Sequence, residues 1–332
     1  MAEKQQHPRI VFVGVHMEAE APFRFLVDSG ENLTGLVTLT PASQGKVSGA
    51  VNLSAIADKA EVPVLHVVNV NEEIVIDWIA QLRPDLLLVV GWTQLLKEPL
   101  LRIPSVAALG FHASLLPKYR GRAPVNWAII NGESETGNTM IVLEPGADEG
   151  DIVAQHRIPI TPEDTCETIY RKVGQTEVEM LAEVLPLVRA GRLPRRKQDP
   201  SEATVMPKRR PEDGVIDWSR SAQDLYNWVR AQTHPYPGAF TFLSNGEGVH
   251  KIRIWQAQQV DQGVSEDGLP NAPQAGTLRR DPAGWPMAAT GCGWLRLISL
   301  QRENEAEISG LQAWGTVLRD GSSFGNRPLG KE

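Results

Sequence analysis

The sequence contains few cysteines, and they form no pattern that binds a metal or builds a disulfide framework. Only Cys166 and Cys292 occur among its 332 residues. A disulfide-stapled fold needs several cysteines, and a structural zinc site needs C-x-x-C or similar clusters of ligands. We therefore expect no metal, and we expect a reducing, cytoplasmic location.

Long apolar runs and a positive net charge are also lacking. No stretch reaches the roughly 20 apolar residues that span a bilayer, and the N-terminal residues MAEKQQHPRI contain no apolar signal-peptide core. We therefore expect no membrane insertion. The formal net charge of −7 argues against non-specific binding of nucleic acid, although a local basic patch would escape this argument.

Several common motifs of nucleotide binding and hydrolysis are absent. The turn after the first apolar run, VFVGVHMEAE, has a single glycine, so the G-x-G-x-x-G fingerprint of dinucleotide binding is missing. The chain also has no G-x-x-x-x-G-K-[ST] and no H-E-x-x-H. These absences argue against ATP-driven enzymes and metalloproteases.

The first half of the chain does contain an alternation of apolar, β-branched runs and amphipathic stretches. It predicts strands at 9–15, 33–39, 63–68, 85–91 and 105–112, with helices between them. Such an alternation predicts an α/β fold with a doubly wound, mainly parallel sheet. Ligands of these sheets bind beyond the carboxyl ends of the strands.

The composition changes near residue 192, which predicts a second domain. The segment 192–214 is charged, rich in proline and without periodicity, so we interpret it as a linker. One helix and several short strands follow it, as in a small β-barrel. We therefore expect a catalytic domain at 1–191, a linker at 192–214 and an OB-like β-barrel domain at 215–332.

Two residues that follow apolar runs are candidates for chemistry. His112 ends the strand predicted at 105–112, and Asp148 lies in an acidic, glycine-rich loop. Because neighbouring parallel strands end at the same edge of a sheet, we expect the two side chains to lie close together. The carboxylate would orient the imidazole, which could then accept a proton from an attacking amine. A core histidine and an ordinary turn aspartate are the alternatives.

The segment KYRGRAP follows His112 and concentrates positive charge. Arg120 and Arg122 suit a phosphate or carboxylate group, since guanidinium binds such oxyanions in a bidentate manner. A solvated basic loop explains the segment equally well.

The segments SLLPKYRGRAPVNWAIINGESETGNT and DEGDIVAQHRIPI resemble the 10-formyltetrahydrofolate-dependent formyltransferases. The pattern they share with this family is H-x-S-L-L-P…R-G…P…W…NGE…TG-x-T…D-x-G-x-I…Q. The segment MPKRRPEDGVIDWSRSAQDLYNWVRAQTHPYPGAF resembles the entry into the family's C-terminal domain. The resemblance is strongest to enzymes that formylate nucleotide-linked amino sugars, and next to methionyl-tRNA formyltransferase. It implies a Rossmann-like core and N10-formyltetrahydrofolate as co-substrate, without a metal.

The resemblance also implies a catalytic Asn, His and Asp, of which this chain keeps two. The His matches His112 and the Asp matches Asp148, but the Asn position holds Gly110. The family's Asn is thought to bond the formyl oxygen as it gains negative charge. Losing one such donor costs about 3–4 kcal/mol of transition-state stabilisation, and glycine offers only its N–H or space for a water.

The family's folate pocket maps onto two strand ends, with aliphatic walls and backbone groups that suit a flat heteroaromatic ring. Ordinary packing at strand ends is the alternative, and a turn cap is the alternative for Ser114. The expected folate-binding residues are Trp92, Gln94, Leu95, Leu96, Val142, Leu143, Glu144, Ala147 and Asp148. The expected acceptor-binding residues are Ser114, Tyr119, Arg120, Arg122 and Asn126.

Three functions follow from this resemblance. The preferred one is N-formylation of a primary amine on a nucleotide-linked amino sugar. The second is formylation of charged tRNA, which predicts a basic face that includes the clusters at 195–197 and 208–210. The third is a folate-binding protein with little transfer activity, because Gly110 replaces the Asn. The sequence leaves open which amine is the acceptor and whether the protein forms a homodimer.

Overall fold

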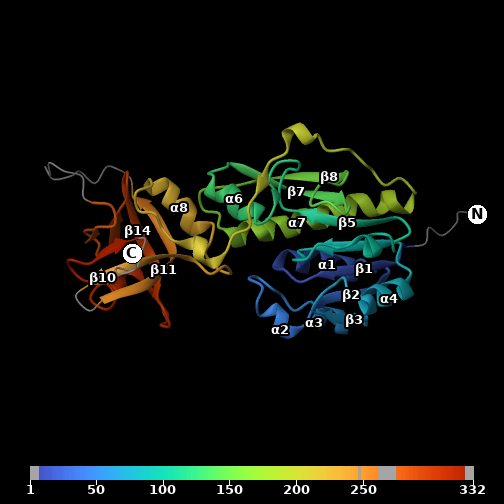
Figure 1. Ribbon diagram of the computed structural model, residues 1–332, viewed down its shortest axis with the longest axis horizontal. Helices are drawn as coiled ribbons and strands as arrows, with labels where there is room; N and C mark the ends of the chain where they lie inside the picture. Colours follow the sequence, from blue (N-terminus) through green and yellow to red (C-terminus); the bar gives the residue numbers. More distant parts are fainter. Residues whose placement is uncertain (1–6, 246–247, 261–273, 326–332) are drawn as a thin grey trace, which may run out of the picture. The chain divides into compact units, whose positions relative to one another are not determined.

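The computed structural model describes residues 7–245, 248–260 and 274–325, and the chain divides into two compact units (Figure 1). The N-terminal unit comprises residues 1–125, 134–161 and 168–208, and the C-terminal unit comprises residues 126–133, 162–167 and 209–332.

The N-terminal unit is built on a sheet with the strand order β3-β2-β1-β4-β5-β7-β8. Pairing is parallel from β3 to β5, as predicted, whereas β7 runs antiparallel to both β5 and β8. The predicted α/β class with a mainly parallel sheet is confirmed. The strands are β1 (Ile10–Gly14), β2 (Leu33–Leu39), β3 (Val64–Val67), β4 (Leu86–Val90), β5 (Ala107–His112), β7 (Glu135–Val142) and β8 (Ile152–Pro159).

Helices pack on both faces of this sheet because its central strands are apolar on both sides. Side chains of β1 and β4 alternate between a core shared with α1, α3 and α7 and a second core shared with α4 and α5. The helices are α1 (Glu20–Asp28), α2 (Pro41–Gln44), α3 (Ser54–Lys59), α4 (Glu73–Leu82), α5 (Glu98–Leu101) and α7 (Cys166–Arg189), with the 3-10 helix η1 (Met17–Ala19) before α1. The helix α6 (Pro124–Ile130) falls mostly in the C-terminal unit.

The C-terminal unit is an antiparallel sheet that curls into a small barrel. Its order is β12-β13-β14-β11-β10-β16, with β15 beside β14. The two outer edges meet where Thr277 pairs with Ser323 and the Phe324 N–H donates to the Gly276 carbonyl, so the predicted barrel-like domain is confirmed. The elements are α8 (Ala222–Arg230), β10 (Ala239–Asn245), β11 (Gly248–Val260), β12 (Leu278–Arg280), β13 (Pro286–Ala289), β14 (Trp294–Arg302), β15 (Glu307–Ser309), α9 (Gly310–Ala313) and β16 (Ser323–Gly325).

The segment interpreted as a linker contains ordered pairings with the N-terminal unit. The Arg196 backbone forms a bridge with Ile152, and β9 (Val205–Met206) pairs in parallel with β6 (Arg120–Gly121). Two 3-10 helices lie in the same segment, η2 (Pro200–Glu202) and η3 (Pro211–Gly214). The boundaries expected at residues 191 and 214 stay a prediction.

Within the described ranges, no helix combines the length and the apolar character that crossing a membrane requires.

Candidate active site

His112 is the last residue of β5, and its imidazole is held from both sides. The side chain is 8% exposed. Its Nε2 lies 2.7 Å from the carbonyl oxygen of Tyr119, and its Nδ1 lies 3.5 Å from Asp148 Oδ1. Because a carbonyl can only accept a hydrogen bond, Nε2 carries the proton in this arrangement. Nδ1 is then the ring nitrogen that faces Asp148.

Asp148 reaches His112 by a route that the sequence did not predict. The expectation that two parallel strands end side by side is wrong here, because β7 runs antiparallel to β5. The loop after β7 instead carries Asp148 back to the imidazole. Asp148 has a φ of +58°, and its Oδ2 accepts a hydrogen bond of 2.9 Å from the Gly121 N–H. The carboxylate is therefore fixed between His112 and the β6 backbone.

The loop after His112 is anchored by two polar side chains that the sequence analysis missed. Thr139 Oγ1 donates to the Ser114 carbonyl and accepts from the Leu116 N–H. Gln155 Nε2 donates to both the Leu116 carbonyl and Thr139 Oγ1, each at 2.9 Å. Thr139 lies on β7 and Gln155 on β8. Both belong to the motif shared with the formyltransferases, Thr139 in TG-x-T and Gln155 as its last residue, so the motif was the signal that could have found them.

Gly110 is buried in β5, and a side chain packs against the place where its own would stand. A Cβ at this position would lie 2.5 Å from Cδ2 and 3.0 Å from Cγ of Leu143. Leu143 is half-buried at the end of β7. The room that an Asn would need beside His112 is thus partly filled by Leu143.

The residues predicted for the folate pocket at the end of β4 fall into different environments. The Trp92 ring packs against the second core, and its Nε1 is buried with no hydrogen-bond partner within the described residues. Leu96 belongs to the same core. The Gln94 side chain bonds the Val70 N–H and the Val68 carbonyl, which ties down a neighbouring loop. Leu95 is 65% exposed.

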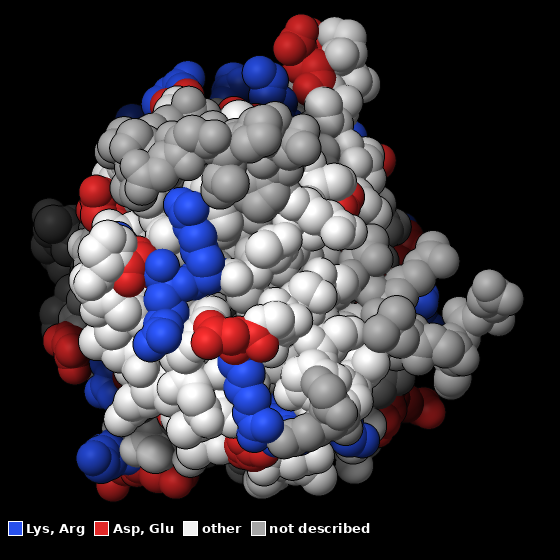
Figure 2. Space-filling view, turned by 90° about the vertical axis from the view of Figure 1, so that its left-hand side faces the viewer, with Lys and Arg blue, Asp and Glu red and all other residues white. Residues whose placement is uncertain are grey.

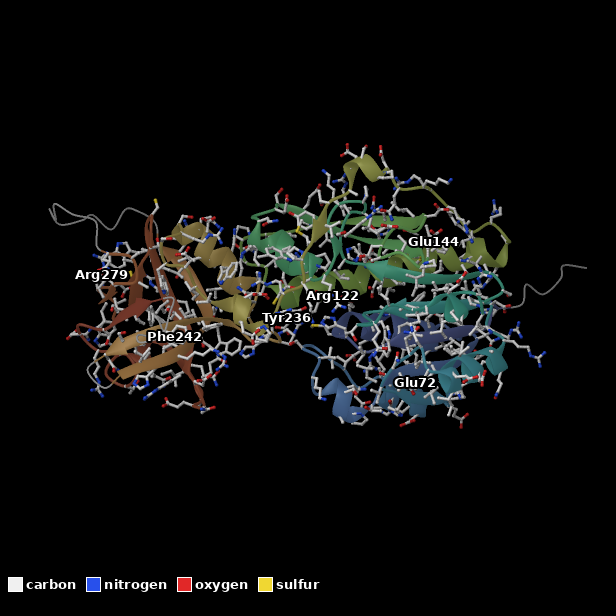
Figure 3. The ribbon with its side chains drawn as sticks, viewed as in Figure 1. Glu72, Arg122, Glu144, Tyr236, Phe242 and Arg279 are labelled. Carbon is white, nitrogen blue, oxygen red and sulfur yellow. The ribbon has the colours of Figure 1, made fainter. Side chains whose placement is uncertain are left out.

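The other folate-pocket residues follow the end of β7. Val142 is buried in the core, Leu143 packs on Gly110, and Glu144 and Ala147 are exposed. Figure 3 labels Glu144, which lies apart from Arg122 on the N-terminal unit.

Among the predicted acceptor-binding residues, Arg122 has an exposed side chain. Arg120 instead directs Nε and Nη2 to Gln198 Oε1, at 3.2 and 2.7 Å. Ser114 Oγ donates to the Lys118 carbonyl within the loop after β5. The remaining two are Tyr119, whose carbonyl faces His112, and Asn126, buried in the C-terminal unit with Nδ2 donating to the Ala231 carbonyl.

In the part of the chain that the structure describes, no group of three or more His, Cys, Asp or Glu side chains is arranged to hold a metal ion.

Both units match models of known protein families. Residues 38–185 match the family model "Formyl transferase", and residues 208–316 match "Formyl transferase, C-terminal domain". The chain is 38% identical over 322 residues to a methionyl-tRNA formyltransferase of Geotalea uraniireducens, covering 96% of this chain and 98% of that protein. A methionyl-tRNA formyltransferase of Citrifermentans bemidjiense is 39% identical, with 96% and 97% covered. The chain therefore belongs to the formyl transferase family, and the predicted enzyme class, a formyltransferase, is confirmed.

Solved structures share the fold at low sequence identity. The N-formyltransferase of Helicobacter canadensis superimposes with a TM-score of 0.62 at 15% identity, covering 88% of this chain and 98% of that one. HypX of Aquifex aeolicus gives 0.63 at 18% identity and 94% of this chain, which spans only 48% of HypX.

Proposed function

We propose that the enzyme transfers a formyl group from N10-formyltetrahydrofolate to the primary amine of methionyl-tRNA, with His112 and Asp148 moving the proton. The observation that carries the chemistry is the approach of the His112 Nδ1 to Asp148 Oδ1 at 3.5 Å. The choice of acceptor is supported by relatives named methionyl-tRNA formyltransferase, which are similar over nearly their whole length.

The hydrogen bond from His112 to the Tyr119 carbonyl decides which nitrogen acts. With Nε2 protonated and bonded to the carbonyl, the free lone pair is on Nδ1. The amine nitrogen of the acceptor bonds to the formyl carbon, and Nδ1 takes the proton that this nitrogen loses. The bond from the formyl carbon to N10 then breaks, and the same proton passes to N10 as tetrahydrofolate leaves.

Asp148 orients the ring and stabilises its charged form. Its Oδ2 is already bonded to the Gly121 N–H, which leaves Oδ1 to face the imidazole. Once Nδ1 is protonated, the two atoms form a charge-assisted pair. Gly110 has no amide side chain, so we assign stabilisation of the negative formyl oxygen to the positive charge that His112 carries once Nδ1 is protonated, and not to a hydrogen bond from its ring.

Positive charge on the segment after α7 suits a polyphosphate acceptor. Arg195, Arg196, Lys197 and Lys208 are exposed, and within the described residues none of them forms an ion pair. Arg122, next to β6, is exposed as well. The face of the C-terminal unit in Figure 2 is mostly uncharged, with cations next to carboxylates. We therefore assign tRNA contacts to residues 195–208 rather than to that face.

A nucleotide-linked amino sugar is the second candidate acceptor. The exposed guanidinium of Arg122 could bind the diphosphate of such a molecule. The net charge of −7 also fits a small substrate better than a long polyanion.

The acceptor is tested by offering the wild-type enzyme N10-formyltetrahydrofolate with each acceptor in turn and following release of tetrahydrofolate. The panel contains charged initiator tRNA, uncharged tRNA and several nucleotide-linked amino sugars. We expect turnover with charged tRNA alone, at a rate that falls steeply with salt. Turnover with an amino sugar, unaffected by competing tRNA, would identify the second candidate.

A further inference from the structure

We infer that Gln198 is a positioning residue that keeps the Asp148 carboxylate at its position beside the His112 imidazole. This inference rests on the function proposed for that pair. Gln198 lies after α7, in the segment between residues 196 and 206 that we call the strap. The strap belongs to the N-terminal unit, as do both members of the pair.

The Gln198 amide joins three parts of the site through all of its polar atoms. Its Nε2 donates to the carbonyls of Asp148 and Gly150, both at 2.8 Å. Its Oε1 accepts from the Arg120 guanidinium at 2.7 Å. A single side chain therefore connects the loop of Asp148 to β6, whose Gly121 N–H holds the carboxylate.

The Asp148 loop needs such an external support. Asp148 has a φ of +58°, a conformation that costs a non-glycine residue about 1–2 kcal/mol. A residue keeps this conformation only where its surroundings determine it. The bonds from Gln198 to the Asp148 and Gly150 carbonyls fix the backbone on both sides of residue 149.

The same strap also holds the residue on the opposite side of the imidazole. Tyr119, with a φ of +58°, accepts the His112 bond through its carbonyl. Its N–H donates to Thr204 Oγ1 at 2.8 Å, and the Arg120 N–H donates to the Thr204 carbonyl. Both neighbours of the imidazole are thus tied to one continuous segment.

The Arg120 side chain is mostly buried and bonds other residues of the protein, so it is not available as an exposed anion-binding group. Its side chain is 11% exposed, with Nη1 3.8 Å from Glu149 Oε1. Two of its nitrogens point to the Gln198 oxygen, which leaves the Gln198 amide nitrogen directed at the Asp148 loop. The guanidinium selects the orientation of the amide, since the reverse orientation would place two donors together.

The test compares Gln198→Met, Gln198→Glu and the control Gln44→Met. Met keeps the volume but removes all hydrogen bonds, and Glu keeps an acceptor for Arg120 but cannot donate to the loop. We expect both Gln198 variants to lose about 10- to 100-fold in kcat through misplacement of the pair, with the KM for folate nearly unchanged. Gln44 on α2 makes the same kind of contact outside this site, with Nε2 donating to the Leu39 carbonyl and to Thr38 Oγ1, so Gln44→Met should keep wild-type kinetics. Full activity of Gln198→Glu would overturn the inference.

A double-mutant comparison separates positioning from a general structural role. If Gln198 acts through Asp148, adding Gln198→Met to Asp148→Asn should cost less than about 2-fold in kcat, because coupled losses are not additive. Multiplicative losses, or equal losses of activity and thermal stability in all variants, would contradict positioning. If Asp148→Asn alone keeps full activity, the proposed site fails; if it is inactive while Gln198→Met is active, only the inference fails.

Discussion

Gly110 shows how one residue changes the neighbourhood of the imidazole. The family resemblance implies an Asn at this position, whereas this chain has a buried glycine covered by the Leu143 side chain. The Gly110 backbone has no positive φ, so conformational strain is no reason for glycine at this position. The reason is the close packing of Leu143. The two residues form a matched pair, and changing one alone disturbs the packing.

We predict that Gly110→Asn destabilises the protein by about 1–3 kcal/mol, which is typical of overpacking. The new side chain must displace Leu143, because its Cβ would stand only 2.5 Å from Leu143 Cδ2. Adding Leu143→Ala should recover most of this loss when compared with Leu143→Ala alone. Denaturant unfolding of the wild type, the two single variants and the double variant measures the coupling, and additive effects would show that Leu143 does not fill the site.

The two residues proposed for proton transfer could be predicted because residue type and position agreed. His112 and Asp148 each follow an apolar strand within a long motif. Gln198 and Thr204 could not be predicted, since they are uncharged residues in an aperiodic segment. The pairing of β6 with β9 and the bridge between Arg196 and Ile152 bring that segment to the site.

At the scale of elements, α7 carries a buried acid that the proposed reaction does not use. Glu177 is fully buried, and neither carboxyl oxygen has a hydrogen-bond partner within the described residues. Burial raises the pKa of Glu177 well above its usual range, the nearby Glu18 raises it further, and Asn138 lowers it. Glu18 in turn lies 3.6 Å from His16. Burial and the charge of Glu18 therefore both favour the neutral form of Glu177 in the folded protein.

We predict that Glu177→Gln raises the melting temperature more at pH 8 than at pH 5. Because the pKa of Glu177 is raised in the folded state, its contribution to stability is complete below the unfolded pKa of about 4.3. That contribution is lost as the pH rises towards the folded pKa. The amide of Glu177→Gln carries no charge at either pH, so the variant does not lose stability in this way as the pH rises.

The matched control is Glu179→Gln on the same helix, because Glu179 is exposed and pairs with His156. Thermal melts of both variants across this pH range measure the effect. An equal change at both pH values for Glu177→Gln would contradict a buried neutral acid.

The pattern of apolar residues predicted the longer strands of the N-terminal sheet, but it did not predict strand direction or the short pairing of β6 with β9. The runs at 85–91 and 105–112 correspond to β4 and β5. The antiparallel direction of β7 has no signature in a run of apolar residues, because direction depends on the path of the preceding loop and α6. The pairing of β6 with β9 involves two residues on each strand, which is too short for any periodicity.

At the scale of the whole molecule, attraction of a charged acceptor depends more on where the charges lie than on the net charge. The chain has a net charge of −7, yet four cations of residues 195–208 are exposed without carboxylate partners in the described ranges. A charged acceptor would sense this local excess within a Debye length of about 8–10 Å.

We predict that reversing three of these charges, Arg195→Glu, Arg196→Glu and Lys197→Glu together, raises the KM for charged tRNA by at least about 10-fold. The slope of log KM against log salt should become shallower, by about one unit for each phosphate that the variant no longer binds. The KM for folate should stay constant. An unchanged KM for tRNA would remove residues 195–197 from the acceptor site.

The most direct test of the account is formyl transfer in a single turnover by His112→Asn, together with its affinity for the folate donor. The Asn amide cannot accept and return the proton, so we predict that transfer falls by roughly 100- to 10,000-fold, while the folate dissociation constant and the melting temperature stay close to wild type. Transfer at near wild-type rate by this variant would contradict the assignment of His112 as the group that takes the proton from the amine.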